Sequence, residues 1–388
     1  MENVSSRCGK SDNAPRLRFP EFRGKWIEKK LGEIFKKNTE KNTELKITNV
    51  ICNSAKNGLI PQREYFDKDI ANSENINGYY IIQKYDFVYN PRKSTEAPYG
   101  PVSVYKYPDK GIVSPLYLCF RATEEINSDF YEFYFKSYSW HRYIYLSGDN
   151  GARHDRVSMR DDVFFAMPVN IPSLPEQKKI AAFFTLLDRR IQKQRQLVEC
   201  LKTYKRGVIK QYFSAQKDNT KWTKSTISNC LFYEQPQKYI VHSEHYSNTY
   251  ETPVLTANKA FILGYTNELD GIYDKGDVLI YDDFTMEVKY VDFPFKVKSS
   301  TIKMLTPQSG IDLYFMFTLL KSLDLQPEGH QRSYISILEP MEVNIPCYEE
   351  QARASGIFRL LDKQIEKEQQ LLHKILDLKS SLLQKMFI

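Results

Sequence analysis

The chain contains one segment twice, and this repeat constrains its fold more than any other feature. Residues 169–213 recur as residues 343–387 without a gap, at a constant offset of 174 residues. The identities include Asp188 with Asp362. A chain of 388 residues is long enough for two or three domains, and 41% hydrophobic residues suffice to fill their cores. The repeat therefore predicts two similar halves, each ending in one copy of the segment.

Each copy of the repeat predicts a long helix. Apolar residues recur at alternating spacings of about three and four, which is the pattern of a coiled-coil seam. The seam positions that we expect to pack are Leu187, Ile191 and Gln194 in the first copy and Leu361, Ile365 and Glu368 in the second. Because the first helix leads into the second variable region and the second helix leads out of it, helices that pack together must run antiparallel. We hypothesise that Gln194 and Glu368 then meet and fix the register.

The region before each helix contains runs typical of β-strands and turns. Examples are Asp86-Phe-Val-Tyr-Asn-Pro91 and Lys275-Gly-Asp-Val-Leu-Ile-Tyr281. The expected fold class is α+β: two α/β domains in a pseudo-twofold arrangement, each followed by a long helix, with the two helices packing as an antiparallel coiled coil. The expected boundaries are a flexible tail at 1–14, a first domain at 15–174, its helix at 175–217, a second domain at 218–348 and its helix at 349–388.

Charge and composition narrow the class of protein. The net charge is +7, and residues 175–216 alone hold ten basic and three acidic residues, so that segment accounts for +7 and the remainder sums to zero. A local basic surface suits phosphates or an acidic partner, although solvated helix faces are often basic as well. Six scattered cysteines without a C-x-x-C spacing, and no apolar run long enough to span a membrane, predict a cytoplasmic protein with reduced thiols.

Several segments resemble the specificity (S) subunit of type I restriction-modification systems. The segments that carry the resemblance are Leu17 to Trp26, Asp86 to Pro91, Gly111 to Pro115, Ile171 to Ile180, Thr252 to Ala257, Asp282 to Thr285, and the helix starts at Phe184 and Phe358. Together they cover nearly the whole chain. The second helix departs from the pattern, with Ser355-Gly356 where the first copy has two alanines.

The resemblance implies a DNA sequence-recognition subunit with two target-recognition domains. Such a subunit reads an asymmetric, bipartite target in double-stranded DNA and docks two methyltransferase (M) subunits and two restriction/translocase (R) subunits. It implies no catalytic residue and no cofactor on this chain. S-adenosylmethionine, ATP and Mg2+ are expected on the partner subunits, which methylate the DNA and cleave it with ATP.

Polar loops are the candidate DNA-reading elements, because their side chains hold phosphates or read base edges. The candidates in the first domain are Asn53, Ser54, Lys56, Asn57, Arg92, Lys93, Ser94, Arg153, His154 and Arg156, and those in the second are Asn258, Lys259, Thr285, Lys289, His330, Gln331 and Arg332. Tyr99 and Tyr334 are candidates for stacking on bases. Changes in one domain are expected to alter only one half of the target.

Two other functions stay open on the sequence alone. Asp282, Asp283, Glu287 and Lys289 match the pattern of a metal-dependent DNA nuclease, whose carboxylates hold Mg2+. The same pattern also arises by chance in a charged hairpin. The other alternative is a coiled-coil protein scaffold, which salt-sensitive duplex binding would distinguish from a DNA reader. His242 and His245 form an H-x-x-H pair without a nearby carboxylate or cysteine set of ligand spacing, so no metal site is predicted there.

Overall fold

The computed structural model describes residues 13–65, 76–148, 155–215, 221–256, 260–327 and 332–388. The chain divides into two compact units: unit 1 comprises Met1–Gln194 and Leu371–Ile388, and unit 2 comprises Arg195–Gln370. Helices and strands are mixed in both units, which confirms the predicted α+β, two-domain fold. The predicted tail at 1–14 lies outside the described residues except for its last two. Among the helices of the described segments, none is long and apolar enough to cross a membrane.

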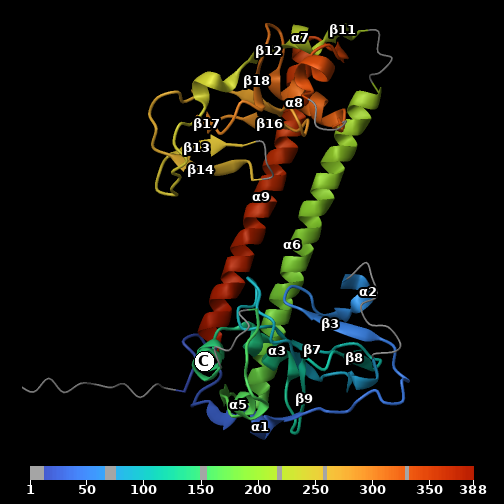
Figure 1. Ribbon diagram of the computed structural model, residues 1–388, viewed down its shortest axis with the longest axis vertical. Helices are drawn as coiled ribbons and strands as arrows, with labels where there is room; N and C mark the ends of the chain where they lie inside the picture. The colour runs from blue at the N-terminus through green and yellow to red at the C-terminus, as the bar shows by residue number, and fades with distance from the viewer. Residues whose placement is uncertain (1–12, 66–75, 149–154, 216–220, 257–259, 328–331) are drawn as a thin grey trace, which may run out of the picture. The chain divides into compact units, whose positions relative to one another are not determined.

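Unit 1 is a mixed α/β domain (Figure 1). Its strands are β1 (Ile27–Lys30), β2 (Phe35–Lys37), β3 (Val50–Ser54), β4 (Gly58–Pro61), β5 (Tyr80–Ile82), β6 (Phe87–Tyr89), β7 (Val102–Val104), β8 (Gly111–Val113), β9 (Leu118–Ala122) and β10 (Pro168–Ile171). Its short helices are α1 (Leu31–Ile34), α2 (Gln62–Tyr65), α3 (Ser128–Lys136), α4 (His141–Ser147) and α5 (Asp161–Phe165). Within the described residues the strands form two four-stranded sheets, β2-β9-β6-β7 and β4-β3-β8-β5, and a β1-β10 pair.

Unit 2 repeats this plan with fewer residues. Its strands are β11 (Thr223–Thr226), β12 (Leu231–Glu234), β13 (Thr252–Leu255), β14 (Ile262–Thr266), β15 (Val278–Asp282), β16 (Val288–Val291), β17 (Lys296–Val297), β18 (Ile302–Pro307) and β19 (Glu342–Ile345). Its short helices are α7 (Ile227–Cys230) and α8 (Leu313–Ser322), and a π-helical turn spans Tyr334–Leu338. The sheets in its described part are β12-β18-β15-β16, β14-β13-β17 and a β11-β19 pair.

The two units share one topology. β3 lies parallel to β8 in unit 1, as β13 lies parallel to β17 in unit 2. The next strand along the chain, β9 or β18, then crosses to the other sheet and pairs antiparallel with two neighbours, β2 and β6 in one unit and β12 and β15 in the other. The duplication seen in the helical repeat therefore includes the domains before it, even though their sequences correspond only weakly.

Two long helices follow the domains: α6 (Leu174–Ala215) and α9 (Tyr348–Met386). In unit 1 the end of α9 packs against the start of α6, where the rings of Phe184 and Phe387 lie 5.9 Å apart and the Lys379 ammonium lies 2.5 Å from the Asp188 carboxylate. Since Asp188 follows Phe184 while Lys379 precedes Phe387, these segments run antiparallel, as predicted.

The same arrangement recurs in unit 2, between the end of α6 and the start of α9. The rings of Tyr212 and Phe358 lie 5.6 Å apart, and the Lys205 ammonium lies 2.5 Å from the Asp362 carboxylate. Lys205 and Lys379 are 174 residues apart, as are Asp188 and Asp362, so the repeat supplies one lysine–aspartate pair to each unit.

The predicted seam residues differ in burial. Ile191, Gln194 and Ile365 are buried, whereas Leu187, Leu361 and Glu368 are partly buried. The Glu368 carboxylate accepts a hydrogen bond from the Gln364 amide, one turn earlier on α9, at 2.7 Å. Gln194 belongs to unit 1 and Glu368 to unit 2, so their pairing stays a prediction.

A hydrogen-bonded clasp explains why Glu-Gln is identical in both copies. The Glu176 carboxylate accepts from the Trp26 indole at 3.3 Å, and Glu350 accepts from Trp222 at 3.2 Å. The glutamine that follows each glutamate accepts from the backbone N–H of a helix N-cap residue. In unit 1 Gln177 accepts from Asn127, which caps α3, at 3.1 Å, and in unit 2 Gln351 accepts from Asp312, which caps α8, at 2.8 Å. Each long helix is thereby fixed to its own domain at its first turn.

Candidate nucleic-acid interface

In unit 1 the three predicted polar loops converge. One follows β3, one follows β6, and one precedes α5. They border a cavity of about 360 Å³, which is lined by Cys52, Asn53, Ser54, Ala55, Asn90, Pro91, Arg92, Lys93, Ser94, Pro101, Ser114, Leu116, Tyr117 and Arg156. Segments that lie up to about a hundred residues apart in the sequence thus place two arginines and a lysine on one concave surface.

Backbone hydrogen bonds join two of these loops. Arg92 and Arg156 form an antiparallel bridge. The Lys93 N–H donates to the Asp155 carbonyl at 2.8 Å, and the Val157 N–H donates to the Pro91 carbonyl at 2.8 Å. The two guanidinium groups are therefore carried by a short two-stranded ribbon, and this rigidity suits a surface that must match a fixed spacing of phosphates or base edges.

The side chains of Asn53 and Ser54 form hydrogen bonds that stabilise their loop. Asn53 is 4% exposed: its amide donates to the Val88 carbonyl at 2.7 Å, and its oxygen accepts from the Ser103 hydroxyl at 2.7 Å. The Ser54 hydroxyl accepts from the Asn57 N–H at 3.3 Å, which closes the turn. These contacts show that both side chains hold the loop in place; their predicted role as base contacts stays a prediction.

The other first-domain candidates differ in position. Lys56 and Asn57 are exposed at the tip of the β3–β4 turn and line a neighbouring cavity of about 440 Å³. Ser94 accepts from the Ala97 N–H at 3.1 Å and so orders its own turn. Arg153 and His154 lie outside the described residues.

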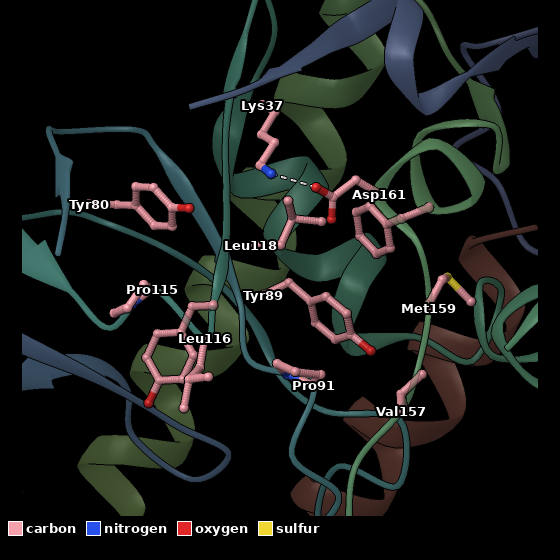
Figure 2. Close-up of a pocket in the computed structure, with 12 residues that line it drawn as sticks. Lys37, Tyr80, Tyr89, Pro91, Pro115, Leu116, Leu118, Val157, Met159 and Asp161 are labelled. Atoms are coloured by element: carbon pink, nitrogen blue, oxygen red, sulfur yellow. Dashed lines mark hydrogen bonds and ion pairs between the residues drawn. The ribbon is translucent and has the colours of Figure 1, made fainter. Parts of the chain in front are cut away.

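A third cavity, of about 290 Å³, adjoins the basic one and was not predicted from the sequence (Figure 2). Tyr80, Tyr89 and Phe164 give it aromatic walls, and Lys37 pairs with Asp161 at 2.5 Å on its rim. The hydrogen bond to this carboxylate raises the pKa of Lys37. Apart from Pro91, Tyr89 of β6 is the one residue lining this cavity that comes from the segment predicted as a strand at 86–91, and the sequence there indicates a strand rather than a cavity.

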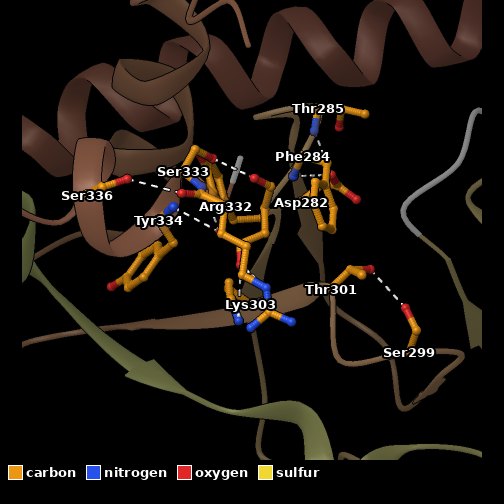
Figure 3. Close-up of polar contacts among 12 residues, drawn as sticks. Asp282, Phe284, Thr285, Ser299, Thr301, Lys303, Arg332, Ser333, Tyr334 and Ser336 are labelled. Atoms are coloured by element: carbon orange, nitrogen blue, oxygen red, sulfur yellow. Dashed lines mark hydrogen bonds and ion pairs between the residues drawn. The ribbon is translucent and has the colours of Figure 1, made fainter. Parts of the chain in front are cut away.

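Figure 3 shows Lys303, Ser333 and Tyr334 at the corresponding place in unit 2, and all three contact Asp283. Its carboxylate accepts from the backbone N–H groups of Ser333 and Tyr334 at 3.1 and 2.9 Å, and the Lys303 ammonium lies 3.2 Å away. These contacts tie the turn after β15 to the segment before β19, as the bridge of Arg92 with Arg156 does in unit 1.

Two predicted residues are presented at this junction. Thr285 is exposed on a turn that the Asp282 carboxylate holds by accepting from the N–H groups of Phe284 and Thr285, at 2.8 and 2.7 Å. The Arg332 side chain is 66% exposed. Each therefore has a side chain accessible to a large partner.

The remaining second-domain candidates are placed as follows. Lys289 is half-buried, with its ammonium 4.5 Å from the centre of the Phe261 ring. Asn258, Lys259, His330 and Gln331 lie outside the described residues. Tyr334 is 1% exposed and packs 4.7 Å from the Tyr233 ring, so the expectation that it stacks on a base is wrong.

The acidic residues of the nuclease pattern have structural partners. Asp282 and Asp283 bind the backbone amides described above, and the Glu287 carboxylate lies 3.9 Å from the Lys289 ammonium. Within the described residues, no group of three or more His, Cys, Asp or Glu side chains is arranged to hold a metal ion. The contacts of Asp282 and Asp283 account for their presence without a metal.

Comparison with known proteins gives consistent matches. Residues 23–203 match the model of the type I restriction modification DNA specificity domain. Over 141 residues the chain is 45% identical to the type I restriction enzyme EcoR124I/EcoR124II specificity subunit of Escherichia coli. That alignment covers 34% of this chain and 35% of the relative, so the chain spans about a third of the length of the curated relative that it matches.

Two solved structures resemble the chain in fold. One is the S subunit of a type I restriction-modification system from M. genitalium, with a TM-score of 0.59 and 15% identity over 97% of this chain and 99% of that one. The other, described under complex assembly and conformational transition of the type I R-M system, has a TM-score of 0.59 and 15% identity over 92% of this chain and 96% of that one. The matches confirm the resemblance that the sequence motifs indicated.

Proposed function

We propose that this chain, whose residues 23–203 belong to the family of type I restriction modification DNA specificity domains, is the DNA sequence-recognition subunit of a type I restriction-modification complex. The observation that carries the proposal is the convergence of Arg92, Lys93 and Arg156 on one rigid concave surface. Arginine and lysine side chains neutralise phosphates and donate to guanine edges in the major groove.

The target that we propose is bipartite and asymmetric. The two units have one topology but carry different side chains at corresponding loops: Arg92 and Arg156 in unit 1 correspond in place to Thr285 and Arg332 in unit 2. Domains of the same fold with different loops are expected to read different half-sites in double-stranded DNA. A pseudo-twofold relation between the domains would orient these half-sites in opposite directions.

The long helices are proposed to set the unread gap between half-sites. A helix of 42 residues extends about 63 Å at 1.5 Å per residue, more than the 34–36 Å of one DNA turn. Four residues inserted into each of α6 and α9 would add about 6 Å, near two base-pair steps. An unchanged gap after such insertions would refute the proposal that the helix length sets the gap between the half-sites.

Exposed apolar positions on the helices support docking of methyltransferase subunits. Leu186 is 63% exposed and Leu360, its equivalent in the repeat, is 67% exposed. Leu197 with Leu371 and Tyr204 with Leu378 are further exposed pairs at the same offset. One duplicated apolar surface fits two copies of one partner, so we propose that two M subunits cover it and that two R subunits join them.

The chemistry is proposed to belong to these partners in the cytoplasm. M subunits would use S-adenosylmethionine, and R subunits would use ATP and Mg2+, while this chain holds none of them. A coiled-coil protein scaffold would not need the basic cavity beside Arg92. A nuclease would need acidic groups that Asp282 and Asp283 instead commit to backbone amides.

The decisive test is a single-molecule methylome of a methylation-free host that expresses this chain with its M subunit, beside the M subunit alone. We expect a split, asymmetric adenine motif that appears only when this chain is present. Assembly of the M–S complex without any motif, together with duplex binding that does not weaken with salt, would favour a protein scaffold instead.

A further inference from the structure

The turn between β8 and β9 holds one apolar side chain out into solvent. Leu116 is 61% exposed. Its N–H donates to the Ser114 hydroxyl at 3.3 Å, and the Tyr117 N–H donates to the Ser114 carbonyl at 3.0 Å. Pro115 fixes the backbone between them. The exposure of Leu116 is therefore imposed by an ordered turn.

Leu116 stands between two unlike cavities. It lines the basic cavity with Arg92 and Arg156, and it also lines the aromatic cavity with Tyr80 and Tyr89 (Figure 2). The next residue, Tyr117, is half-buried and lines both cavities as well. Single exposed leucines are common on protein surfaces, but this one occupies the boundary of the proposed reading surface.

We propose that Leu116 is a wedge that inserts between two adjacent base pairs of the first half-site and partly unstacks them. The inference rests on the proposed function, because Arg92 and Arg156 must first hold the duplex. Apolar side chains such as leucine and proline insert at base steps and kink the duplex where it rests on a protein. Pyrimidine–purine steps unstack most easily, so the first half-site should contain such a step opposite Leu116.

Unit 2 offers an internal comparison. Its corresponding turn joins the parallel strand β17 to β18, as the Leu116 turn joins β8 to β9. That turn carries Ser299, Ser300 and Thr301, and the Ser299 and Thr301 hydroxyls lie 2.8 Å apart (Figure 3). No apolar side chain is present at those three positions. The distortion should therefore be confined to the half-site read by unit 1.

The test uses the assembled M–S complex and duplexes of its methylome-defined target, with 2-aminopurine placed in turn at each step of both half-sites. With the wild-type chain, fluorescence should rise about threefold or more at one step of the first half-site and at none of the second. Leu116→Ser, which copies unit 2, should abolish the rise, whereas Leu116→Met should retain it. Leu269→Ser, which removes a leucine that is 90% exposed in unit 2, should leave the rise unchanged.

Affinity provides an independent readout. Leu116→Ser should weaken binding to the intact target about tenfold, but by less than about threefold when a mismatch already loosens the affected step. An equal loss on both duplexes would overturn the wedge, as would an unchanged fluorescence rise in Leu116→Ser. Loss of M–S assembly in Leu116→Ser would also overturn it, since Leu116 would then be a subunit contact.

The two proposals fail in different ways. Sequence-specific, salt-sensitive binding by the wild-type complex without any rise in fluorescence would refute the wedge and leave the proposed function intact. Absence of sequence-specific duplex binding by the wild-type complex would refute both.

Discussion

Removing the Asp283 side chain is predicted to destabilise unit 2 strongly. That side chain is 2% exposed, its Lys303 partner is 8% exposed, and it also accepts from two buried backbone N–H groups. Asp283→Ala removes the carboxylate partner of the Lys303 ammonium and leaves the Tyr334 N–H without its acceptor, whereas the Ser333 N–H keeps its bond to the backbone carbonyl of residue 283 at 3.0 Å. Breaking a buried pair by removing one partner costs about 3–5 kcal/mol, so we expect unit 2 to lose about that much.

Hydrogen exchange followed by mass spectrometry measures this loss in each unit separately. For Asp283→Ala, amides in β15 and β18 should exchange about 10²- to 5 × 10³-fold faster, while amides in β6 and β9 of unit 1 should not change. Glu287→Ala is the matched control, because its side chain is 55% exposed and pairs only at 3.9 Å. The control should cost less than about 0.5 kcal/mol.

A double replacement separates the charge from the backbone contacts. In Asp283→Asn with Lys303→Met, the amide oxygen still accepts from the two N–H groups and no unpaired ammonium remains. We therefore expect a smaller loss than in Asp283→Ala, about 1–2 kcal/mol. The reasoning would be refuted if Asp283→Ala accelerated exchange in unit 2 by less than about threefold, or if the double variant lost as much as Asp283→Ala.

Three further predictions concern pH, the helices and specificity. Burial lowers the pKa of His141 to about 4 from its ordinary 6.5, so between these pH values the unfolded chain binds a proton that the folded unit excludes. Unit 1 should therefore lose stability as the pH falls from 6.5 to 4. His141→Gln should flatten the pH dependence of the hydrogen-exchange rates in unit 1. Lys379→Met should destabilise only unit 1 and Lys205→Met only unit 2, each by about 0.5–1 kcal/mol in the same exchange assay, because both pairs are partly exposed. Arg156→Ala should relax only the first half-site in a methylome, and Arg332→Ala only the second, each by about tenfold or more in affinity for the target; a change in the opposite half would contradict the domain assignment.

The helices were the most predictable part of the chain, for a physical reason. A seam repeats every few residues, and the copies that begin near Val169 and Val343 show the same spacing twice. The antiparallel direction followed from connectivity alone. The clasp at Glu176 and Glu350 was not predicted, since its partners Trp26 and Trp222 lie more than a hundred residues away and no local pattern connects them.

The candidate interface was predictable only at the level of loops. Turn-forming residues placed Arg92 and Arg156 on loops, and the structure brings these loops together through backbone bonds that the sequence does not encode locally. Asn53 illustrates the limit: its type fits base recognition, but tertiary packing satisfies its amide internally. Leu116 shows the opposite case. An apolar residue in a strand-rich region is expected to be buried in the core, and only the structure of its turn shows that Leu116 is exposed.

The composition of unit 1 from both ends of the chain has a consequence for its synthesis. Leu383, Met386 and Phe387 belong to the same core as Trp26 and its neighbours, whereas unit 2 is formed by one continuous stretch, Arg195–Gln370. During translation the first domain to leave the ribosome is thus the last to be completed, because its core lacks these side chains until synthesis reaches them. Unit 2 includes none of residues 371–388, so its core does not depend on that segment.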